Sequence, residues 1–337
     1  MAHNPKLNVY ILTLNSKKDE FETFRDLFKL KYNSGVTDED SKVFGKYFQD
    51  FLNNIGKDDF RKDDKAKKVL GVAKSVSDET SYSINPMFEQ FTIEGVLDGG
   101  KYGILREYAD IDNKDDKQIL DGKKAVLDKF YICLCTPLNS KYGYLLIQSY
   151  TEETIQEPLK NFMRQLFLHE DAFYNIIIEP YVPDRFVEKF QKESKVRLFS
   201  YTSKVGVSQI LREKKIIVKG QAFEVKIELA PIDHTLVPSS DELGEILNVV
   251  DRKLFDGHEL GSFKKKVYIA DKKERKAHYD IEKELSSIKP TIYLEDEGIQ
   301  VDSVTGLPDF IQIKEFCSKL LIDIKKEFNK KVDIHEF

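Results

Sequence analysis

A glutamate and a lysine two residues apart, Glu224 and Lys226, form the most recognisable chemical pattern in the sequence. They lie in Ala222–Leu229, whose apolar and β-branched residues predict a strand. In many metal-dependent nucleases the glutamate of an E-x-K pattern helps to hold a divalent metal, and the lysine orients or activates water. Mg²⁺ is the cofactor that this interpretation requires, and the sequence indicates no other cofactor.

The metal-site interpretation needs a second acid that the sequence does not clearly supply. The neighbouring strand, predicted over residues 214–219, contains no acid, and only Glu213 lies at its edge. An E-x-K triplet also arises readily in a chain in which 33% of the residues are charged. The alternative interpretation is that Glu224 and Lys226 are solvated on the outer face of their strand.

The densest positive charge lies between Lys264 and Lys276. Seven bases stand against two acids there, which gives a local net charge of +5 in a chain whose net charge is -5. The bases are Lys264, Lys265, Lys266, Lys272, Lys273, Arg275 and Lys276. Such a segment can neutralise phosphates, and its neighbours Tyr268 and Tyr279 can stack on nucleobases. The alternative is an ordinary lysine-rich surface in contact with water.

Three other patterns favour structural roles. Residues 98–103 are rich in glycine, but a strand is expected after them, so they predict a hairpin turn and not a phosphate-binding loop. Cys133 and Cys135 alternate with apolar residues, which predicts small buried side chains and not metal ligands. None of the six histidines has a second histidine at the i+4 spacing of a helical metal site.

Hairpins and amphipathic helices must position these residues, and a second hairpin is expected around residues 137–141. Strands are expected over residues 7–14, 90–97, 101–108, 129–136, 142–149, 174–179, 195–202, 214–219, 222–229, 265–270 and 291–294. Helices are expected over residues 17–32, 38–54, 154–168, 183–193, 239–255 and 309–329. Because this order lacks regular β–α–β alternation, it predicts an α+β fold of two lobes, each a mainly antiparallel, hairpin-built sheet packed with amphipathic helices.

Length and composition indicate two domains. The chain has 337 residues, and single cores stop growing at roughly 250–300 residues. Pro180 and Pro183 mark a boundary, which divides the chain into an N-terminal scaffold domain, residues 1–182, and a C-terminal domain with the basic segment, residues 183–337. Three cysteines, no signal-peptide pattern and no apolar run of membrane length predict a cytoplasmic protein.

The leading functional hypothesis is a non-enzymatic or sensor-like protein of bacterial type that binds nucleic acid or a protein partner through residues 264–276. The first alternative is a metal-dependent nuclease centred on Glu224 and Lys226. The Lys-, Asn- and Phe-rich composition is typical of AT-rich bacterial or mobile-element genomes. In its general character the chain resembles proteins of bacterial defence loci and prophages, which implies as a second alternative a subunit of an antiviral-defence or prophage-encoded complex. A third is an assembly subunit, such as a homo-oligomer, in which the amphipathic C-terminal helix docks on a partner. No membrane partner is indicated.

Overall fold

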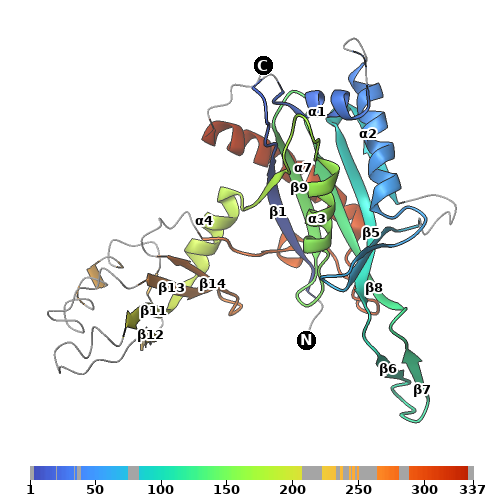
Figure 1. Ribbon diagram of the computed structural model, residues 1–337. Helices are drawn as coiled ribbons and strands as arrows, with labels where there is room; N and C mark the ends of the chain where they lie inside the picture. The colour runs from blue at the N-terminus through green and yellow to red at the C-terminus, as the bar shows by residue number, and fades with distance from the viewer. Residues whose placement is uncertain are drawn as a thin grey trace. The chain divides into compact units, whose positions relative to one another are not determined.

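The computed structural model describes residues 4–19, 21–33, 35, 39–74, 83–206, 222–232, 236–237, 243, 245–246, 249, 264–280 and 288–332. The chain divides into two compact units (Figure 1). Unit 1 comprises Met1–Tyr181 and Thr291–Phe337, and unit 2 comprises Val182–Pro290. The predicted α+β fold is confirmed, and every strand pair between described residues is antiparallel.

A nine-stranded sheet forms the centre of unit 1. Its strands are β1 (Lys6–Thr13), β2 (Arg61–Asp63), β3 (Lys68–Val72), β4 (Ile84–Met87), β5 (Thr92–Tyr102), β8 (Ala125–Cys135), β9 (Tyr142–Ser149), β10 (Ile177–Tyr181) and β15 (Ile292–Tyr293). The main order is β10-β1-β9-β8-β5-β3-β2, with β15 beside β1 and β4 beside β5. The predicted hairpin of β8 and β9 is confirmed.

Helices cover both faces of this sheet (Figure 1). They are α1 (Phe24–Lys31), α2 (Asp40–Ile55), α3 (Gln156–Leu166) and α7 (Phe310–Lys331), with short 3₁₀ turns η1 (Phe88–Gln90) and η4 (Leu294–Glu297). Helices α1, α2 and α3 share one aromatic-rich core with alternate residues of the strands. The other strand residues, which alternate with these core residues, face α7 on the opposite side of the sheet. There Lys314 Nζ of α7 lies 2.5 Å from Oε1 of the buried Glu94 of β5. This ion pair accounts for a charged side chain inside the sheet–helix layer.

The hairpin predicted around residues 98–100 is wrong. Strand β5 continues straight through these residues and pairs with β8 over its whole length. The glycines serve close packing, because a Cβ on Gly99 would lie 2.4 Å from Ile155 Cγ2, and one on Gly100 would lie 1.7 Å from the carbonyl oxygen of Val126. The chain reverses later, through a two-stranded arm of β6 (Arg106–Ala109) and β7 (Lys117–Leu120).

The chain leaves unit 1 and returns to it at neighbouring points. Strands β10 and β15 both pair with the same edge of β1, where Val9 lies opposite Tyr181 and Leu7 opposite Ile292. The two strands run in the same direction and form two parts of one edge of the sheet. Unit 2 is therefore inserted between them. Unit 1 includes Thr291–Phe337, whereas the sequence analysis assigned these residues to a C-terminal domain of residues 183–337.

Unit 2 contains a four-stranded sheet in the order β12-β11-β13-β14. Its elements are α4 (Asp184–Glu193), β11 (Lys195–Gly206), β12 (Ala222–Leu229), β13 (Lys264–Ala270) and β14 (Lys276–Asp280). A small core lies on one face of this sheet and includes Val187 of α4. The predicted strand over 214–219, Glu213 and most of the predicted helix over 239–255 fall outside the described residues.

No helix within the described ranges is long and apolar enough to cross a lipid bilayer.

Candidate functional site

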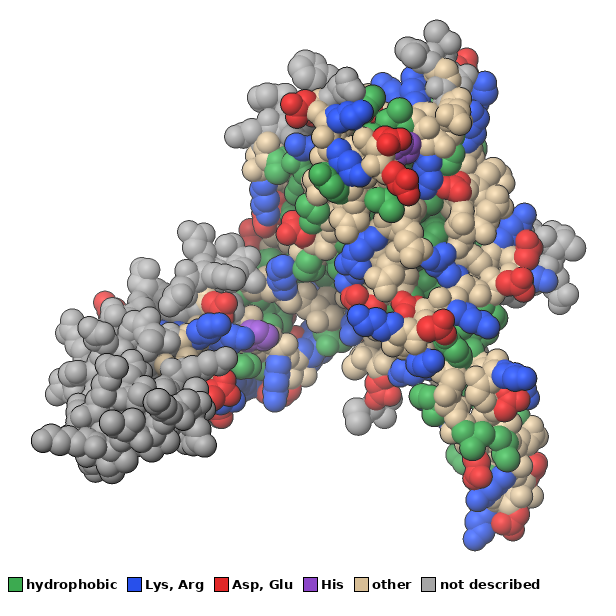
Figure 2. All heavy atoms as spheres, in the orientation of Figure 1, with side chains coloured by type: hydrophobic (Ala, Val, Ile, Leu, Met, Phe, Trp, Pro, Cys, Tyr) green, Lys and Arg blue, Asp and Glu red, His purple; other side chains and the backbone are tan. Residues whose placement is uncertain are grey.

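The sheet of unit 2 has one apolar face and one polar face. Val267 and Ile269 of β13 are buried in the core. Because successive side chains of a strand point to opposite faces, Lys264, Lys266 and Tyr268 lie on the other face. In Figure 2 basic and acidic side chains alternate over the described part of this unit.

The strand register brings the two sequence-predicted features onto this polar face. Lys226 of β12 lies opposite Thr202 of β11, and Thr202 lies opposite Lys264 of β13. Glu228 and Lys266 occupy the next cross-strand row, on either side of β11. The backbones of β12 and β13 are thus two strand spacings apart, or about 10 Å. Residues that are 38 positions apart in sequence therefore share one surface.

An aromatic pair lies beside these lysines. The rings of Tyr268 and His278 are cross-strand neighbours with centroids 5.4 Å apart and planes inclined by 32°. His278 is exposed and Tyr268 is partly exposed. Lys276 is on the same face of β14, two residues from His278. The side chain of Tyr279 falls outside the described ranges, so its predicted stacking role stays a prediction.

The other bases of the segment do not join this surface. Lys265 points to the opposite face, where its Nζ lies 6.0 Å from the centroid of the Tyr201 ring. Lys272 and Lys273 are exposed in the turn that joins β13 to β14. The seven bases therefore divide among two sheet faces and a turn, although their local charge density suggested one patch.

Arg275 has a structural contact. Its Nη2 lies 2.6 Å from Oδ2 of Asp271, whose side chain is only 4% exposed. Burial would raise the pKa of Asp271, but hydrogen bonds from Arg275 and from the backbone N–H groups of Lys273 and Arg275 outweigh it and hold that pKa below its usual value. Arg275 thus stabilises the turn through Asp271.

Glu224 and Lys226 are both exposed, and Lys226 is ion-paired. Its Nζ lies 2.6 Å from Oε1 of Glu228, and the hydrogen bond to this carboxylate raises the pKa of Lys226. The residues of β11 opposite Glu224 and Lys226 are Lys204 and Thr202. Across the described ranges, no three His, Cys, Asp or Glu residues cluster closely enough to hold a metal ion. The nuclease interpretation stays a prediction.

One further lysine of this face, Lys195, lies outside the basic segment of residues 264–276. Lys195 of β11 pairs with Ala270, which in turn pairs with Lys276. Its place depends on a register irregularity between Val196 and Leu198. No feature of the sequence marks that bulge, so Lys195 could be found only from the strand pairing.

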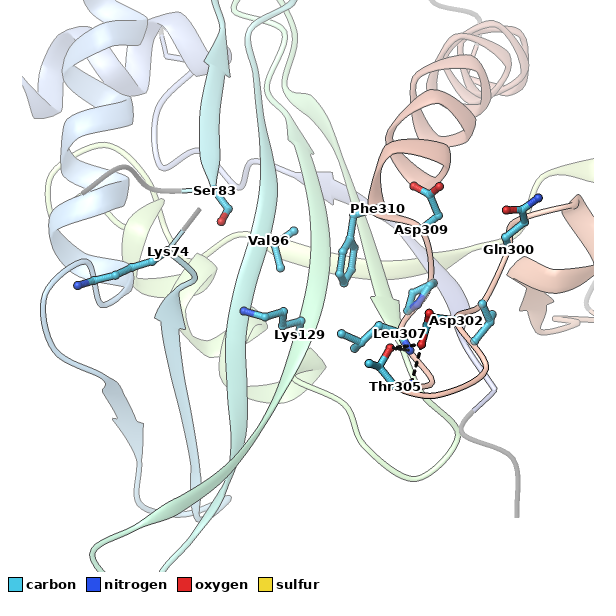
Figure 3. A pocket seen from close by; sticks show the side chains of 12 residues that line it. Lys74, Ser83, Val96, Lys129, Gln300, Asp302, Thr305, Leu307, Asp309 and Phe310 are labelled. Atoms are coloured by element: carbon cyan, nitrogen blue, oxygen red, sulfur yellow. Dashed lines mark hydrogen bonds between the residues drawn. The ribbon is translucent and has the colours of Figure 1, made fainter. Parts of the chain in front are cut away.

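Unit 1 contains a separate cavity of about 510 Å³ between the sheet and the chain that leads into α7 (Figure 3). Phe310 and Leu307 line it on the side of α7, and Lys74 points away from the other labelled side chains. Asp302 accepts hydrogen bonds from the backbone and hydroxyl of Thr305.

Two other charged residues of this cavity, Asp309 and Lys129, also have structural contacts. Asp309 caps α7 by accepting hydrogen bonds from two backbone N–H groups, and Lys129 pairs with Asp98 at 3.1 Å. The polar face of unit 2 is therefore the better candidate, because it combines lysines with a tilted pair of aromatic rings.

Comparison with protein-family models and with curated proteins finds no match to this chain.

Proposed function

We propose that unit 2 binds single-stranded nucleic acid through its polar sheet face. We call this surface the lysine face and define it as Lys195, Lys226, Lys264, Lys266, Tyr268, Lys276 and His278. One observation carries the proposal: the paired rings of Tyr268 and His278, with planes tilted by 32°, lie among lysines on one face of an antiparallel sheet.

The aromatic pair favours a single strand over a duplex. Unpaired bases expose their π-faces and can stack on aromatic side chains, with a contribution of about 1–3 kcal/mol per base. Four-stranded sheets with aromatic side chains bind single-stranded RNA in this way. In a duplex the bases already stack on one another, so Tyr268 and His278 would gain no such contact. The same aromatic pair favours nucleic acid over an acidic protein partner. Lysines alone could bind either partner, but only nucleic acid offers bases that stack on the two rings.

Electrostatics predicts moderate, salt-sensitive binding. The face carries Glu224, Glu228 and Asp280 among its lysines, and the whole chain has a net charge of -5. Attraction to phosphates must therefore come from the local surface, and it will fall as salt screens it.

A cytoplasmic location fits this proposal. Cys133, Cys135 and Cys317 are free and buried, and burial raises the pKa of the Cys133 and Cys317 thiols. Free thiols persist in reducing compartments. The raised pKa of Cys133 and Cys317 and the burial of all three thiols make them poor nucleophiles, so we assign them a packing role.

Fluorescence anisotropy with labelled single-stranded and duplex oligonucleotides tests the proposal. We expect the full-length protein to bind the single strand more tightly than the duplex of the same sequence. Lys264→Glu combined with Lys266→Glu should weaken this binding about tenfold or more, because two attractions become repulsions. Tyr268→Ala should weaken binding to the single strand by about 1–3 kcal/mol and leave duplex binding unchanged.

The matched control reverses two lysines of unit 1. Lys114 and Lys319 are exposed, and Lys114→Glu with Lys319→Glu changes the net charge by the same amount. If this control weakens binding as much as the variant of the lysine face, the lysine face is not the binding site.

Incubation of the protein with nucleic acid and Mg²⁺ or Mn²⁺ tests the nuclease alternative, which fails if Glu224→Ala cleaves as well as the wild type.

A further inference from the structure

A second basic site lies in unit 1, where the β6–β7 arm leaves the sheet. A pocket of about 710 Å³ opens there, within the roughly 300–1,000 Å³ typical of small-molecule sites. Its lining includes Phe60, Lys62, Tyr102, Lys123, Lys124 and Leu127. None of these residues belongs to unit 2, so the site is independent of the lysine face.

The sheet itself builds the floor of this pocket. Lys62, Val69, Gly100 and Leu127 form one cross-strand row through β2, β3, β5 and β8. The row is apolar in its centre and ends in a lysine, and 42% of the Leu127 side chain remains exposed. A ligand on this floor would meet carbon atoms below it and a positive charge at one end.

Two aromatic rings border the floor. Phe60 lies against the backbone of Gly71, since a Cβ at that position would be 2.8 Å from Phe60 Cδ1. Phe60 is nevertheless 43% exposed. The hydroxyl of Tyr102 donates a hydrogen bond to Asp64, which fixes its ring at the pocket. Tyr102 is partly exposed. Accessible rings at fixed positions suit a flat ligand group.

The lysines of the pocket have no compensating carboxylates. In the described part of the chain, the side chains of Lys62, Lys123 and Lys124 form no ion pair or hydrogen bond, and no carboxylate lines the pocket. Asp121, the acid nearest in sequence to Lys123 and Lys124, accepts instead from the backbone N–H of Lys123 at 2.8 Å. Asp63, which follows Lys62, accepts hydrogen bonds from the backbone N–H of Ala66 and from the Asn161 side chain. Three like charges around one hollow repel one another, and an anion bound between them relieves that repulsion.

We infer that this pocket binds a nucleoside polyphosphate. The base would lie against the apolar floor and the rings of Phe60 and Tyr102, while the phosphates would face Lys62, Lys123 and Lys124. Three unpaired cations match the several negative charges of a polyphosphate better than the single charge of a carboxylate. The exposed rings account for the base, which inorganic phosphate lacks.

Isothermal titration calorimetry of the full-length protein with ATP, GTP, adenosine and inorganic triphosphate tests this inference. ATP or GTP should bind, and adenosine and triphosphate should each bind about tenfold more weakly or worse, because each lacks half of the contacts. Lys62→Glu with Lys123→Glu and Lys124→Glu should reduce nucleotide affinity by about tenfold or more. Phe60→Ala should weaken ATP binding and leave triphosphate binding unchanged.

Two controls place the binding site. Lys114→Glu, in the same arm but outside the pocket, should leave affinity unchanged, as should the Lys264→Glu/Lys266→Glu variant of unit 2. The inference is overturned if neither nucleotide binds, if the triple variant binds as well as the wild type, or if triphosphate binds as tightly as ATP. Because the side chains of the three lysines form no ion pair or hydrogen bond with the described residues, circular dichroism should show that the triple variant is folded.

Discussion

At the scale of single residues, Asp271 organises the turn between β13 and β14. Its carboxylate accepts hydrogen bonds from the backbone N–H groups of Lys273 and Arg275 and from the Arg275 side chain. This arrangement holds Lys266 and Lys276 in register on either side of the turn, because β13 and β14 pair directly beyond it. A buried acid therefore helps to present the bases of the lysine face.

Asp271→Asn should destabilise the protein by about 1–3 kcal/mol near neutral pH, because it weakens charge-assisted hydrogen bonds to a buried group. The folded state holds the pKa of Asp271 below its usual value. Its stabilising contribution is therefore complete above the unfolded pKa of about 3.9 and is lost as the pH falls through the lower, folded pKa.

Urea unfolding of the wild type and the variant between about pH 7 and pH 2 measures this difference. The difference in unfolding free energy between the wild type and Asp271→Asn should become smaller as the pH falls below the pKa of an aspartate in the unfolded chain. A constant gap across the whole range would show that the charge of Asp271 does not stabilise the turn.

The sequence identified the charged segment but did not show how its bases divide between the two faces of the sheet and the turn. The sequence shows that Lys264–Lys276 is basic but does not show which side chains share a face. Lys265 and Lys266 are neighbours in sequence and point to opposite faces. Lys264 and Lys226 share a face only because β12 and β13 both pair with β11. Strand register depends on contacts distant in sequence, so local composition could not reveal it.

At the scale of elements, α7 shows why an amphipathic stripe needs a structure to identify its partner. Its periodicity predicted the helix over residues 309–329, and the structure has Phe310–Lys331. Its buried residues include Cys317 and Leu320, and they pack on β5 and β8 of unit 1. The stripe is thus explained by contacts within the chain, whereas the sequence left open an external partner.

Leu320→Ala should destabilise unit 1 by about 2–5 kcal/mol, the cost of a cavity at a fully buried leucine. Ile322→Ala is the matched control on the same helix, because Ile322 is 55% exposed and should cost only about 0.5 kcal/mol or less. Thermal unfolding compares the two variants. Light scattering should give the wild type, Leu320→Ala and Ile322→Ala the same molar mass. A lower mass for Leu320→Ala alone would instead indicate that the apolar stripe of α7 holds an oligomer together.

Turn signals predicted one hairpin correctly and another wrongly, for different physical reasons. Between β8 and β9 the chain has room for a proline-containing loop, and the reversal occurs there. Gly99 and Gly100 carry an equally strong turn signal, yet they remain extended because Ile155 and the backbone of Val126 approach them closely. Glycine permits tight packing as well as turns, and the sequence does not distinguish the two uses.

At the scale of the whole molecule, unit 2 is an insertion into an edge of the sheet of unit 1. Tyr181 and Ile292 lie opposite residues of β1 that are two positions apart, so the ends of the insertion are about 7 Å apart along that strand. Prolines near residue 182 signalled the start of the insertion. No comparable signal shows that residues 291–337 return to unit 1, because that return is fixed by pairing with β1 and packing of α7.

Replacing residues 182–290 with a short Gly/Ser linker should leave unit 1 folded. The linker has to span only the short distance between two points on one sheet edge, and unit 1 retains its helices and strands. Circular dichroism and thermal unfolding should show a cooperative transition. Loss of that transition would mean that unit 1 depends on unit 2 for stability.

The salt dependence of single-strand binding is the most direct test of the lysine face. On a single strand, log Kobs should fall linearly with log salt concentration by about 0.7 for each phosphate neutralised, which gives a slope of roughly -2 to -3 for the wild type. Lys264→Glu with Lys266→Glu should reduce the steepness by at least about 1.4. Binding that is independent of salt, or a slope that this variant leaves unchanged, would contradict the assignment of nucleic-acid binding to this surface.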